Sequence, residues 1–193
     1  MQEVYFENDK VNMLFAGSFQ NYAYDPKTNL LAISVRGNPD DVLSGTYFID
    51  QSGMRKVDEA GLVYYLGWRD YPFILAAGST KLLSTSGESK TLAEIELVPF
   101  ASRNNKYVAL CDSEWSQTTN GLRVFDNDGN LVFEIKDQKI TKIVWRIDSR
   151  GLFYVANNQL YYVEIQDKLS VLIDSHLNDE EFETMYMTFN WVR

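Results

Sequence analysis

The stretch Ile140–Asp174 constrains the fold of this chain more than any other part of the sequence. It contains four short apolar segments separated by three polar turns, whose sequences are RIDSR, NNQ and QDK. The first apolar segment ends in Trp145. Short apolar runs between turn residues are typical of β-strands. The stretch therefore predicts four short strands in succession.

The same pattern recurs along the chain. Each of four windows begins with an aromatic residue and continues through a polar turn into a buried strand. The windows start at Tyr24, Trp68, Phe100 and Trp145, so the aromatic residues are 44, 32 and 45 residues apart. A fourth, half-solvated strand closes each unit after a tight turn of the QSG, SGE, NDGN or QDK type. The third strands of the four units are predicted at 45–50, 80–85, 121–126 and 159–165.

Four strands in a repeat of roughly 40 residues is the period of a β-propeller blade. We therefore expect an all-β fold, a β-propeller segment with four four-stranded antiparallel blades and partial blades at both termini. Trp68, Phe100 and Trp145 are expected to be buried between adjacent sheets. The alternative is a β-sandwich, which does not explain why one turn pattern recurs four times. The expected boundaries of this single domain, 1–193, are a partial blade at 1–17, repeats at about 20–60, 61–97, 98–138 and 139–176, and a partial blade at 182–193.

This pattern resembles that of the WD40-like and TolB-like propeller superfamily, and the resemblance covers nearly all of the chain. The Gly-His and terminal Trp-Asp pairs of true WD40 repeats are absent from the sequence. The resemblance therefore implies the fold and transfers no functional residue. The sequence predicts no helix apart from one or two turns at Asn178–Glu183, which Asn178 or Asp179 would cap.

The net charge and the counts of cysteine and histidine argue against several classes of function. The formal net charge of -9 argues against a nucleic acid partner, because binding a phosphate backbone requires clustered Lys and Arg. Cys111 is the only cysteine, and its neighbours predict a buried thiol. His176 is the only histidine, so a histidine-based zinc site or a Ser-His triad would depend on that residue alone. No apolar run is long enough for a membrane span and no secretory signal is recognisable, so we expect a cytoplasmic location. The alternative is an extracytoplasmic location, if the sequence is an excised segment of a longer protein.

The motif Asp126–Asn130 resembles the start of a calcium loop. A calcium loop also needs a bidentate Glu at offset eleven, whereas Glu134 follows Asp126 at offset eight. The flanking residues predict strands, so a hairpin turn accounts for the motif. Glycine-rich phosphate loops and nucleophile elbows are missing. The sequence therefore predicts no catalytic residue, no metal site and no cofactor.

Two long loops carry the candidate functional residues. The connections between second and third strands are short in the second and fourth repeats, but they span 36–44 and 112–120 in the first and third. Long loops often carry function, and a Trp among polar residues is a candidate hot spot for a partner. The acidic residues would give this end a negative charge. The predicted partner-binding residues are Arg36, Asp40, Asp41, Asp112, Glu114 and Trp115.

The predicted function is a non-catalytic protein–protein interaction module or scaffold. Its partner would be another protein or the remainder of a longer propeller chain. One alternative is a propeller enzyme that uses the loop carboxylates as acids, bases or metal ligands. Another alternative is an accessory propeller that filters access to the catalytic domain of a larger enzyme.

The two ends of the chain align with interior repeats. Glu3–Phe15 aligns with Tyr161–Ile173 and predicts the third and fourth strands of a blade. Met185–Arg193 aligns with Ile140–Asp148 and predicts a first strand, in which Trp191 follows Trp145 by 46 residues. Such ends leave sheet edges to be covered, so we expect either a segment of a longer propeller or a second chain that supplies the missing strands.

Overall fold

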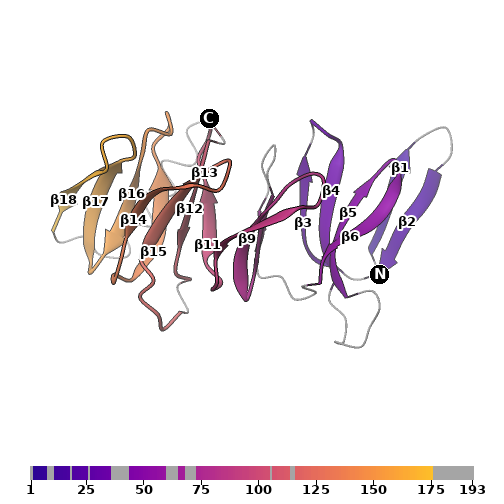
Figure 1. The fold of residues 1–193 in the computed structure, drawn as a ribbon, viewed down its shortest axis with the longest axis horizontal. Coiled ribbons are helices and arrows are strands. Elements are labelled where there is room, and N and C mark those ends of the chain that lie inside the picture. The colour runs from indigo at the N-terminus through magenta and orange to yellow at the C-terminus, as the bar shows by residue number, and fades with distance from the viewer. Residues whose placement is uncertain are drawn as a thin grey trace. The chain divides into compact units, whose positions relative to one another are not determined.

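The computed structural model describes residues 2–7, 11–17, 19–25, 27–35, 44–59, 65–67, 73–104, 106–113 and 116–175. Every regular element within these ranges is a β-strand, so the fold is all-β (Figure 1). No helix in the described ranges has the length and apolar character needed to cross a membrane. The chain forms two compact units, Met1–Glu96 and Leu97–Arg193.

The first unit holds a two-stranded sheet and two four-stranded antiparallel sheets. In the two-stranded sheet, β1 (Gln2–Glu7) pairs with β2 (Val11–Gly17). The strand orders of the larger sheets are β3-β4-β5-β6 and β10-β9-β8-β7. Their strands are β3 (Phe19–Asp25), β4 (Leu30–Val35), β5 (Gly45–Asp50), β6 (Gly53–Asp58), β7 (Tyr65–Gly67), β8 (Phe73–Ala77), β9 (Ser79–Leu83) and β10 (Ser89–Ala93).

The second unit holds two further four-stranded antiparallel sheets, and each again pairs its strands in the order of the chain. The four larger sheets confirm the prediction of four four-stranded blades. The strands of the second unit are β11 (Val98–Ala101), β12 (Tyr107–Cys111), β13 (Leu122–Asp126), β14 (Leu131–Ile135), β15 (Ile140–Trp145), β16 (Gly151–Ala156), β17 (Gln159–Glu164) and β18 (Leu169–Asp174).

Turn chemistry explains why consecutive strands pair so closely. Asn157 and Asn158 join β16 to β17, and both have positive φ angles, 53° and 58°. Two successive residues with positive φ are required by the tight hairpin turn whose twist matches that of the strands, and Asn tolerates this conformation. Gly129, between β13 and β14, has φ 73°. These turns fix the register of each hairpin.

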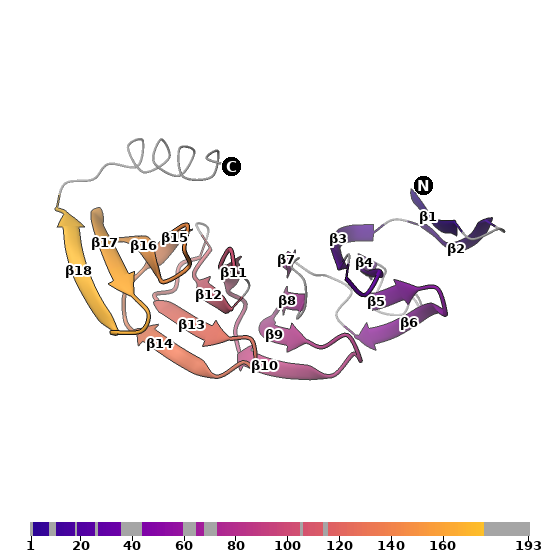
Figure 2. The same cartoon turned by 90° about the horizontal axis from the view of Figure 1, so that it is seen from above.

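The two sheets of the second unit pack face to face. Figure 2 shows the β15–β18 sheet beside the β11–β14 sheet, and β15 contacts both β11 and β12. Their shared core is apolar and buried, because alternate residues of each strand point to the same face. The core includes Ala109, Cys111, Leu122, Val124 and Phe133 from one sheet and Ile140, Ile143, Trp145, Leu152, Tyr154, Ala156 and Val163 from the other.

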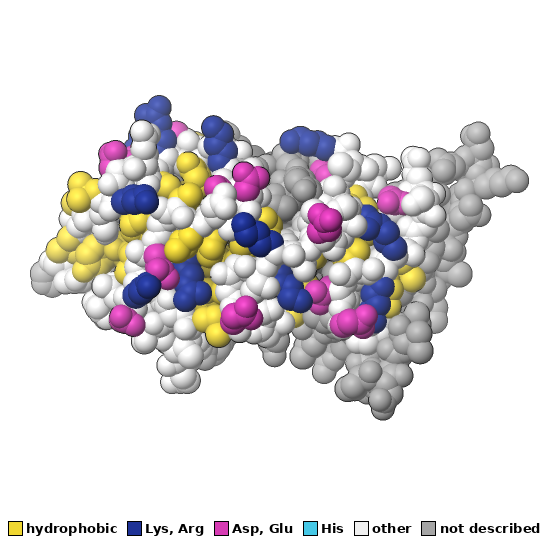
Figure 3. All heavy atoms as spheres, in the orientation of Figure 1, with side chains coloured by type: hydrophobic (Ala, Val, Ile, Leu, Met, Phe, Trp, Pro, Cys, Tyr) yellow, Lys and Arg dark blue, Asp and Glu magenta, His cyan; other side chains and the backbone are white. Residues whose placement is uncertain are grey.

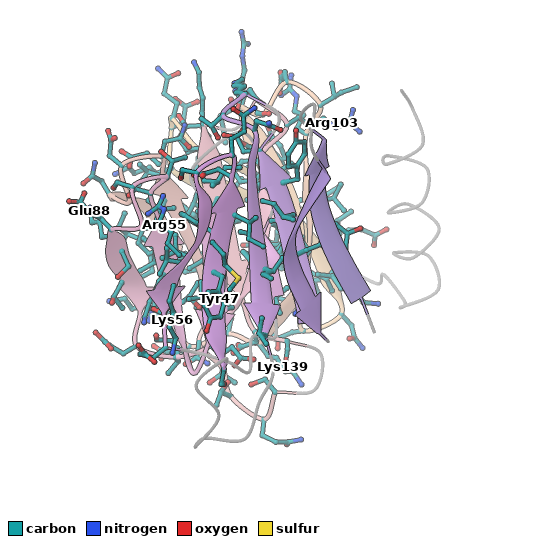
Figure 4. All side chains as sticks on the ribbon, turned by 90° about the vertical axis from the view of Figure 1, so that its right-hand side faces the viewer. Tyr47, Arg55, Lys56, Glu88, Arg103 and Lys139 are labelled. Atoms are coloured by element: carbon teal, nitrogen blue, oxygen red, sulfur yellow. The ribbon has the colours of Figure 1, made fainter. Side chains whose placement is uncertain are left out.

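The β3–β6 and β7–β10 sheets of the first unit share a smaller core of the same kind. Phe48 lies in it against Leu75 and Leu83 of the neighbouring sheet. The Arg55 guanidinium lies 5.2 Å from the centre of the Phe48 ring and donates to the backbone carbonyls of Thr85 and Ser86, the latter at 2.6 Å. Arg55 is therefore a link between the two sheets (Figure 4).

Trp145 confirms the prediction of an aromatic residue buried between blades. Its indole Nε1 donates to the backbone carbonyl of Phe100 at 2.7 Å, and its ring stacks on Tyr107 with centroids 6.1 Å apart. Phe100 is half-buried and packs against the same core from the other sheet. Trp68, the third residue in that prediction, lies outside the described residues.

The repeat alignment implied that the aromatic residues occupy one equivalent position in each repeat. The structure shows that those it describes do not. The turn bonds Ser102 N to Tyr107 O and Arg146 N to Gly151 O are equivalent, so Trp145 corresponds to Ala101 and not to Phe100. A shift of one residue reverses the face of a strand. Tyr24 departs further from the expected core position. It is 38% exposed, because Ala23 and Asp25 take the buried face of β3.

Each four-stranded sheet has a register irregularity in the pairing of its third and fourth strands. A β-bulge places an extra residue in one strand and increases the local twist. The irregularity recurs in all four sheets, and in each sheet it lies between the third strand and the outermost, fourth strand. The shifts lie between Thr46 and Tyr47, between Thr91 and Ala93, between Val124 and Phe125, and between Leu160 and Tyr161.

The N-terminal strand–turn–strand prediction is confirmed by the antiparallel pairing of β1 with β2. Strand β2 contacts β6, the outermost strand of the next sheet, as a fourth strand of a preceding blade would. The strand predicted at Met185–Arg193 and the short helix predicted at Asn178–Glu183 lie outside the described residues.

Candidate interaction surface

The predicted partner-binding residues come from two loops, one in each compact unit, and each loop is described by itself. In the first loop, Arg36, Asp40 and Asp41 lie outside the described residues. In the second, Glu114 and Trp115 do as well, while Asp112, Ser113 and 116–120 are described. The residues for which the structure gives geometry therefore come from the second loop, which we call the β12–β13 loop (112–120).

The topology places the β12–β13 loop at a defined end of its sheet. Figure 4 shows Arg103, in the β11–β12 turn, and Lys139, in the β14–β15 connection, at opposite ends of the strands. Strand β12 runs away from the Arg103 end, so the loop that follows it lies at the Lys139 end. The β16–β17 turn at Asn157 and Asn158 lies at this end as well.

Asp112 is the centre of the β12–β13 loop. Its side chain is 1% exposed, and both of its carboxylate oxygens accept hydrogen bonds from the far end of the loop. Oδ1 accepts from Thr118 Oγ1 at 2.8 Å and from Asn120 Nδ2 at 2.7 Å, and Oδ2 accepts from Asn120 N at 2.8 Å. A buried carboxylate needs such donors, because an unpaired buried charge is costly.

The location of Asp112 differs from the acidic surface position that we expected. A buried carboxylate with three donors does not present its charge to a partner; it closes the loop between β12 and β13. The prediction counted Asp112 among the acidic residues that give this end its negative charge, whereas its bonds to Thr118 and Asn120 hold it inside the loop. Its contribution to binding would therefore be indirect, through the shape of the loop.

The rest of the described loop is polar and well bonded. Ser116 N donates to Ser113 O at 3.0 Å, and Thr118 N donates to Ser116 Oγ at 3.1 Å. The side chains of Gln117, Thr118 and Thr119 are exposed. Such internal bonding orders the loop before any partner arrives, which lowers the entropy cost of binding.

Gly121 ends the loop in a position that only glycine fits. Its φ is +79°, in the region that side chains disfavour, and a Cβ there would lie 1.9 Å from the carbonyl oxygen of Ile135. This close approach joins the base of the loop to the end of β14. The loop is thus anchored at one end by Asp112 and at the other by Gly121.

Cys111 precedes the loop and is fully buried in β12, as predicted. Burial raises the pKa of its thiol above the ordinary value, with a smaller effect from the nearby Asp112 charge. We expect no alkylation by iodoacetamide in the native state at pH 8, because the thiolate is the reacting form. In urea one thiol should react. Mass spectrometry of the intact protein measures both, and rapid native labelling would contradict the buried position.

The calcium-like motif forms a hairpin turn, as predicted. Asp126 Oδ1 accepts from the backbone amides of Asp128 and Asn130 at 3.0 and 2.8 Å, and its Oδ2 accepts from Asn130 Nδ2 at 3.0 Å. These bonds satisfy the carboxylate within the turn between β13 and β14. In the described part of the chain, no group of three or more His, Cys, Asp or Glu residues could hold a metal ion.

Sequence reasoning missed the roles of Thr118 and Asn120. Both lie in the predicted loop, but the prediction treated them only as polar neighbours of Trp115 and gave them no role. One signal could have identified them, because Asp, Thr and Asn side chains are those that bond to nearby backbone in turns. Asp112 begins the loop, and Asn120 ends it next to Gly121. This pattern indicates a loop whose two ends are joined by hydrogen bonds.

Comparison with known proteins places the chain by its fold. No family model matches the sequence, and no curated protein matches it. Among solved structures, the tricorn protease is similar over 89% of this chain and 21% of its own, with 13% identity and a TM-score of 0.57. A chain of the mitotic checkpoint complex is similar over 79% of this chain and 48% of its own, with 12% identity and a TM-score of 0.51.

A TolB protein from Agrobacterium tumefaciens also matches, over 86% of this chain and 66% of its own, with 13% identity and a TM-score of 0.48. All three are β-propeller structures. The likeness to the tricorn protease and to the checkpoint chain shows that this chain has a β-propeller fold, as the repeat pattern predicted. It spans about a fifth of the tricorn protease chain and about half of the checkpoint chain.

Proposed function

We propose that this chain is a non-catalytic interaction module or scaffold that binds another protein through the β12–β13 loop. The observation that carries the proposal is the construction of that loop. A buried Asp112 holds its two ends together, while Gln117, Thr118 and Thr119 are exposed around it. Loops held by a rigid sheet are the usual sites of recognition on β-folds.

The chemistry of the loop favours a protein partner. In the described part of the loop, the exposed side chains are an amide and two hydroxyls, which both donate and accept hydrogen bonds. Trp115, in the middle of the loop sequence, is the residue type most enriched at energetic hot spots. One of the propeller structures that this chain resembles belongs to a protein complex, the mitotic checkpoint complex.

Trp115→Ala is expected to weaken partner binding by more than about 1 kcal/mol while leaving the unfolding free energy nearly unchanged. The physical reason is that Asp112 and Gly121 hold the described ends of the loop, so we expect the residue at position 115 to contribute to recognition and not to stability. Partners captured by cross-linking in cells can be quantified for the parent and the variant. The binding of each captured protein is then titrated with purified components.

A matched control is Ile147→Ala. Ile147 is also apolar and 60% exposed, but it lies in the β15–β16 turn at the opposite end of the same unit. It should leave partner capture unchanged. Two results would contradict the proposal: equal loss from both variants, or a large loss of stability in Trp115→Ala, which would make Trp115 a structural residue.

A titration with divalent ions separates this proposal from the enzyme alternative. Any ligand that binds only the folded state raises the melting temperature. We expect no change on addition of Mg²⁺, Ca²⁺, Mn²⁺ or Zn²⁺. A clear rise that is lost in a variant with Asp40, Asp41 and Glu114 changed to Asn or Gln would support a metal site made by the loop carboxylates.

A further inference from the structure

The outward face of the β15–β18 sheet, on the side away from the β11–β14 sheet, carries an apolar stripe beside a polar group. In that group the Tyr162 hydroxyl accepts from Arg146 at 3.0 Å and donates to Glu164. Leu169 and Val171 on β18 are 62% and 45% exposed, and Ile173 is 54% exposed. Val144 and Leu160 lie deeper on the same face and pack with Phe153 and Val155. Figure 3 shows hydrophobic side chains gathered on the part of the surface formed by β17 and β18. Such a stripe of exposed large apolar residues is typical of a surface that another element covers.

The two sheets of the second unit show which kind of element fits this face. In the β11–β14 sheet, Phe100, Ala109, Val124 and Phe133 form one row across four strands. In the β15–β18 sheet, the equivalent row is Val144, Phe153, Tyr162 and Val171. The first row lies under the neighbouring sheet, whereas the second row ends in exposed Val171. The two faces are therefore equivalent by register, and one of them already receives a sheet.

The face of the β11–β14 sheet is covered by β15, the first strand of the next sheet, which ends in Trp145. Trp145 lies over the first row, with its indole bonded to Phe100 O and its ring stacked on Tyr107. The equivalent acceptor on the outward face is the backbone carbonyl of Val144. An aromatic pair lies beside it, because the Phe153 and Tyr162 rings are 5.0 Å apart. The Tyr162 hydroxyl lies over Gly151, the residue equivalent to Tyr107.

The segment Met185–Arg193 carries the pattern of such a first strand. Its sequence, MYMTFNWVR, aligns with Ile140–Asp148 and places Trp191 at the position of Trp145. It lies outside the described residues and follows β18 in the chain after residues 175–184. Strand β18 ends at the Lys139 end of the sheet, where β15 begins, because the four strands are antiparallel in chain order. Those ten residues therefore need only to cross from the outermost to the innermost strand of the sheet.

We propose that Met185–Arg193 docks on the outward face of the β15–β18 sheet as the first strand of another blade, with Trp191 over Val144 and Tyr162. The docked strand would cover the inner part of the face. The outward face is a different surface from the β12–β13 loop, and a strand can dock on it whether or not that loop binds a partner.

Hydrogen exchange of the full 193-residue chain tests the proposal. We expect slow amide exchange in 185–193 in the parent protein. Tyr162→Ala removes the aromatic surface on the outward face, and Trp191→Ala removes the docked side chain. Each should accelerate exchange in 185–193 and lower the melting temperature by about 2–4 °C. The double variant should show little further change, because the two side chains share one contact.

Leu172→Ala is the matched control for the face. Leu172 is 46% exposed on β18 and pairs with Tyr161, whose ring is on the opposite face, stacked on Tyr154. It should leave exchange in 185–193 unchanged. Fast exchange in the parent, no response to Tyr162→Ala, or fully additive effects of the two variants would overturn the proposal. So would protection that disappears on dilution together with a dimer seen by light scattering, because a second copy would then be the occupant.

Discussion

Replacing Trp145 with alanine is expected to lower the free energy of unfolding by about 3–5 kcal/mol. The side chain is buried in the core between the β11–β14 and β15–β18 sheets, where it packs on Tyr107 and donates to Phe100 O. Its removal leaves a cavity between the two sheets and an acceptor that has lost its donor. Urea unfolding followed by circular dichroism measures the loss.

Trp145→Phe separates the two contributions. Phenylalanine keeps most of the packing and loses the indole donor, so we expect a smaller loss of about 1–2 kcal/mol. If Trp145→Ala melts within a degree or two of the parent, the assignment of Trp145 to the core between blades is wrong. A loss confined to one of two unfolding transitions would show that the two units unfold separately.

Asp112→Ala is expected to cost about 2–4 kcal/mol of stability and to disorder the β12–β13 loop. The substitution removes a buried carboxylate that accepts three hydrogen bonds. The donors on Thr118 and Asn120 then lose their acceptor. Partner binding should fall as well, although Asp112 is buried. Stability is measured by urea unfolding, and the order of the loop is measured by hydrogen exchange at residues 116–120.

Asp112→Asn is the informative control. The amide keeps one acceptor oxygen and the size of the side chain, but its NH₂ group faces a donor. We expect a loss of stability between those of the parent and the alanine variant. If Asp112→Ala unfolds like the parent and exchange in the loop does not change, then the loop does not depend on this carboxylate. The explanation of its shape would have to be replaced.

The strands and turns of this chain could be predicted from sequence because they depend on neighbouring residues. The predicted third strand at 45–50 coincides with β5, and the predicted tight turn of Asn157 and Asn158 has the positive φ angles that such turns require. Alternating burial and turn chemistry act over a few residues, so a single sequence shows them. Four repetitions of one pattern then indicated the blade.

The faces of the strands and the interior of the loop were less accessible to sequence reasoning. The aromatic at the end of each first strand looked equivalent, yet Phe100 and Trp145 differ by one position and reach the same core from opposite sheets. One extra residue before a turn is enough to reverse a face. Asp112 looked exposed because its donors lie six and eight residues further along the chain.

The bulges described above have a consequence for how this protein behaves at high concentration. Strands β6, β10 and β14 each leave one side of their backbone without a partner strand in their own sheet. An open edge is a template on which a second molecule can add a strand and begin a fibre. The register shift beside each of these strands twists the edge, and Arg55, Lys90 and Glu134 add charge along it. A second molecule that adds a strand to one of these three edges would have to straighten a twisted edge, so we expect fibre growth to be disfavoured at its first step.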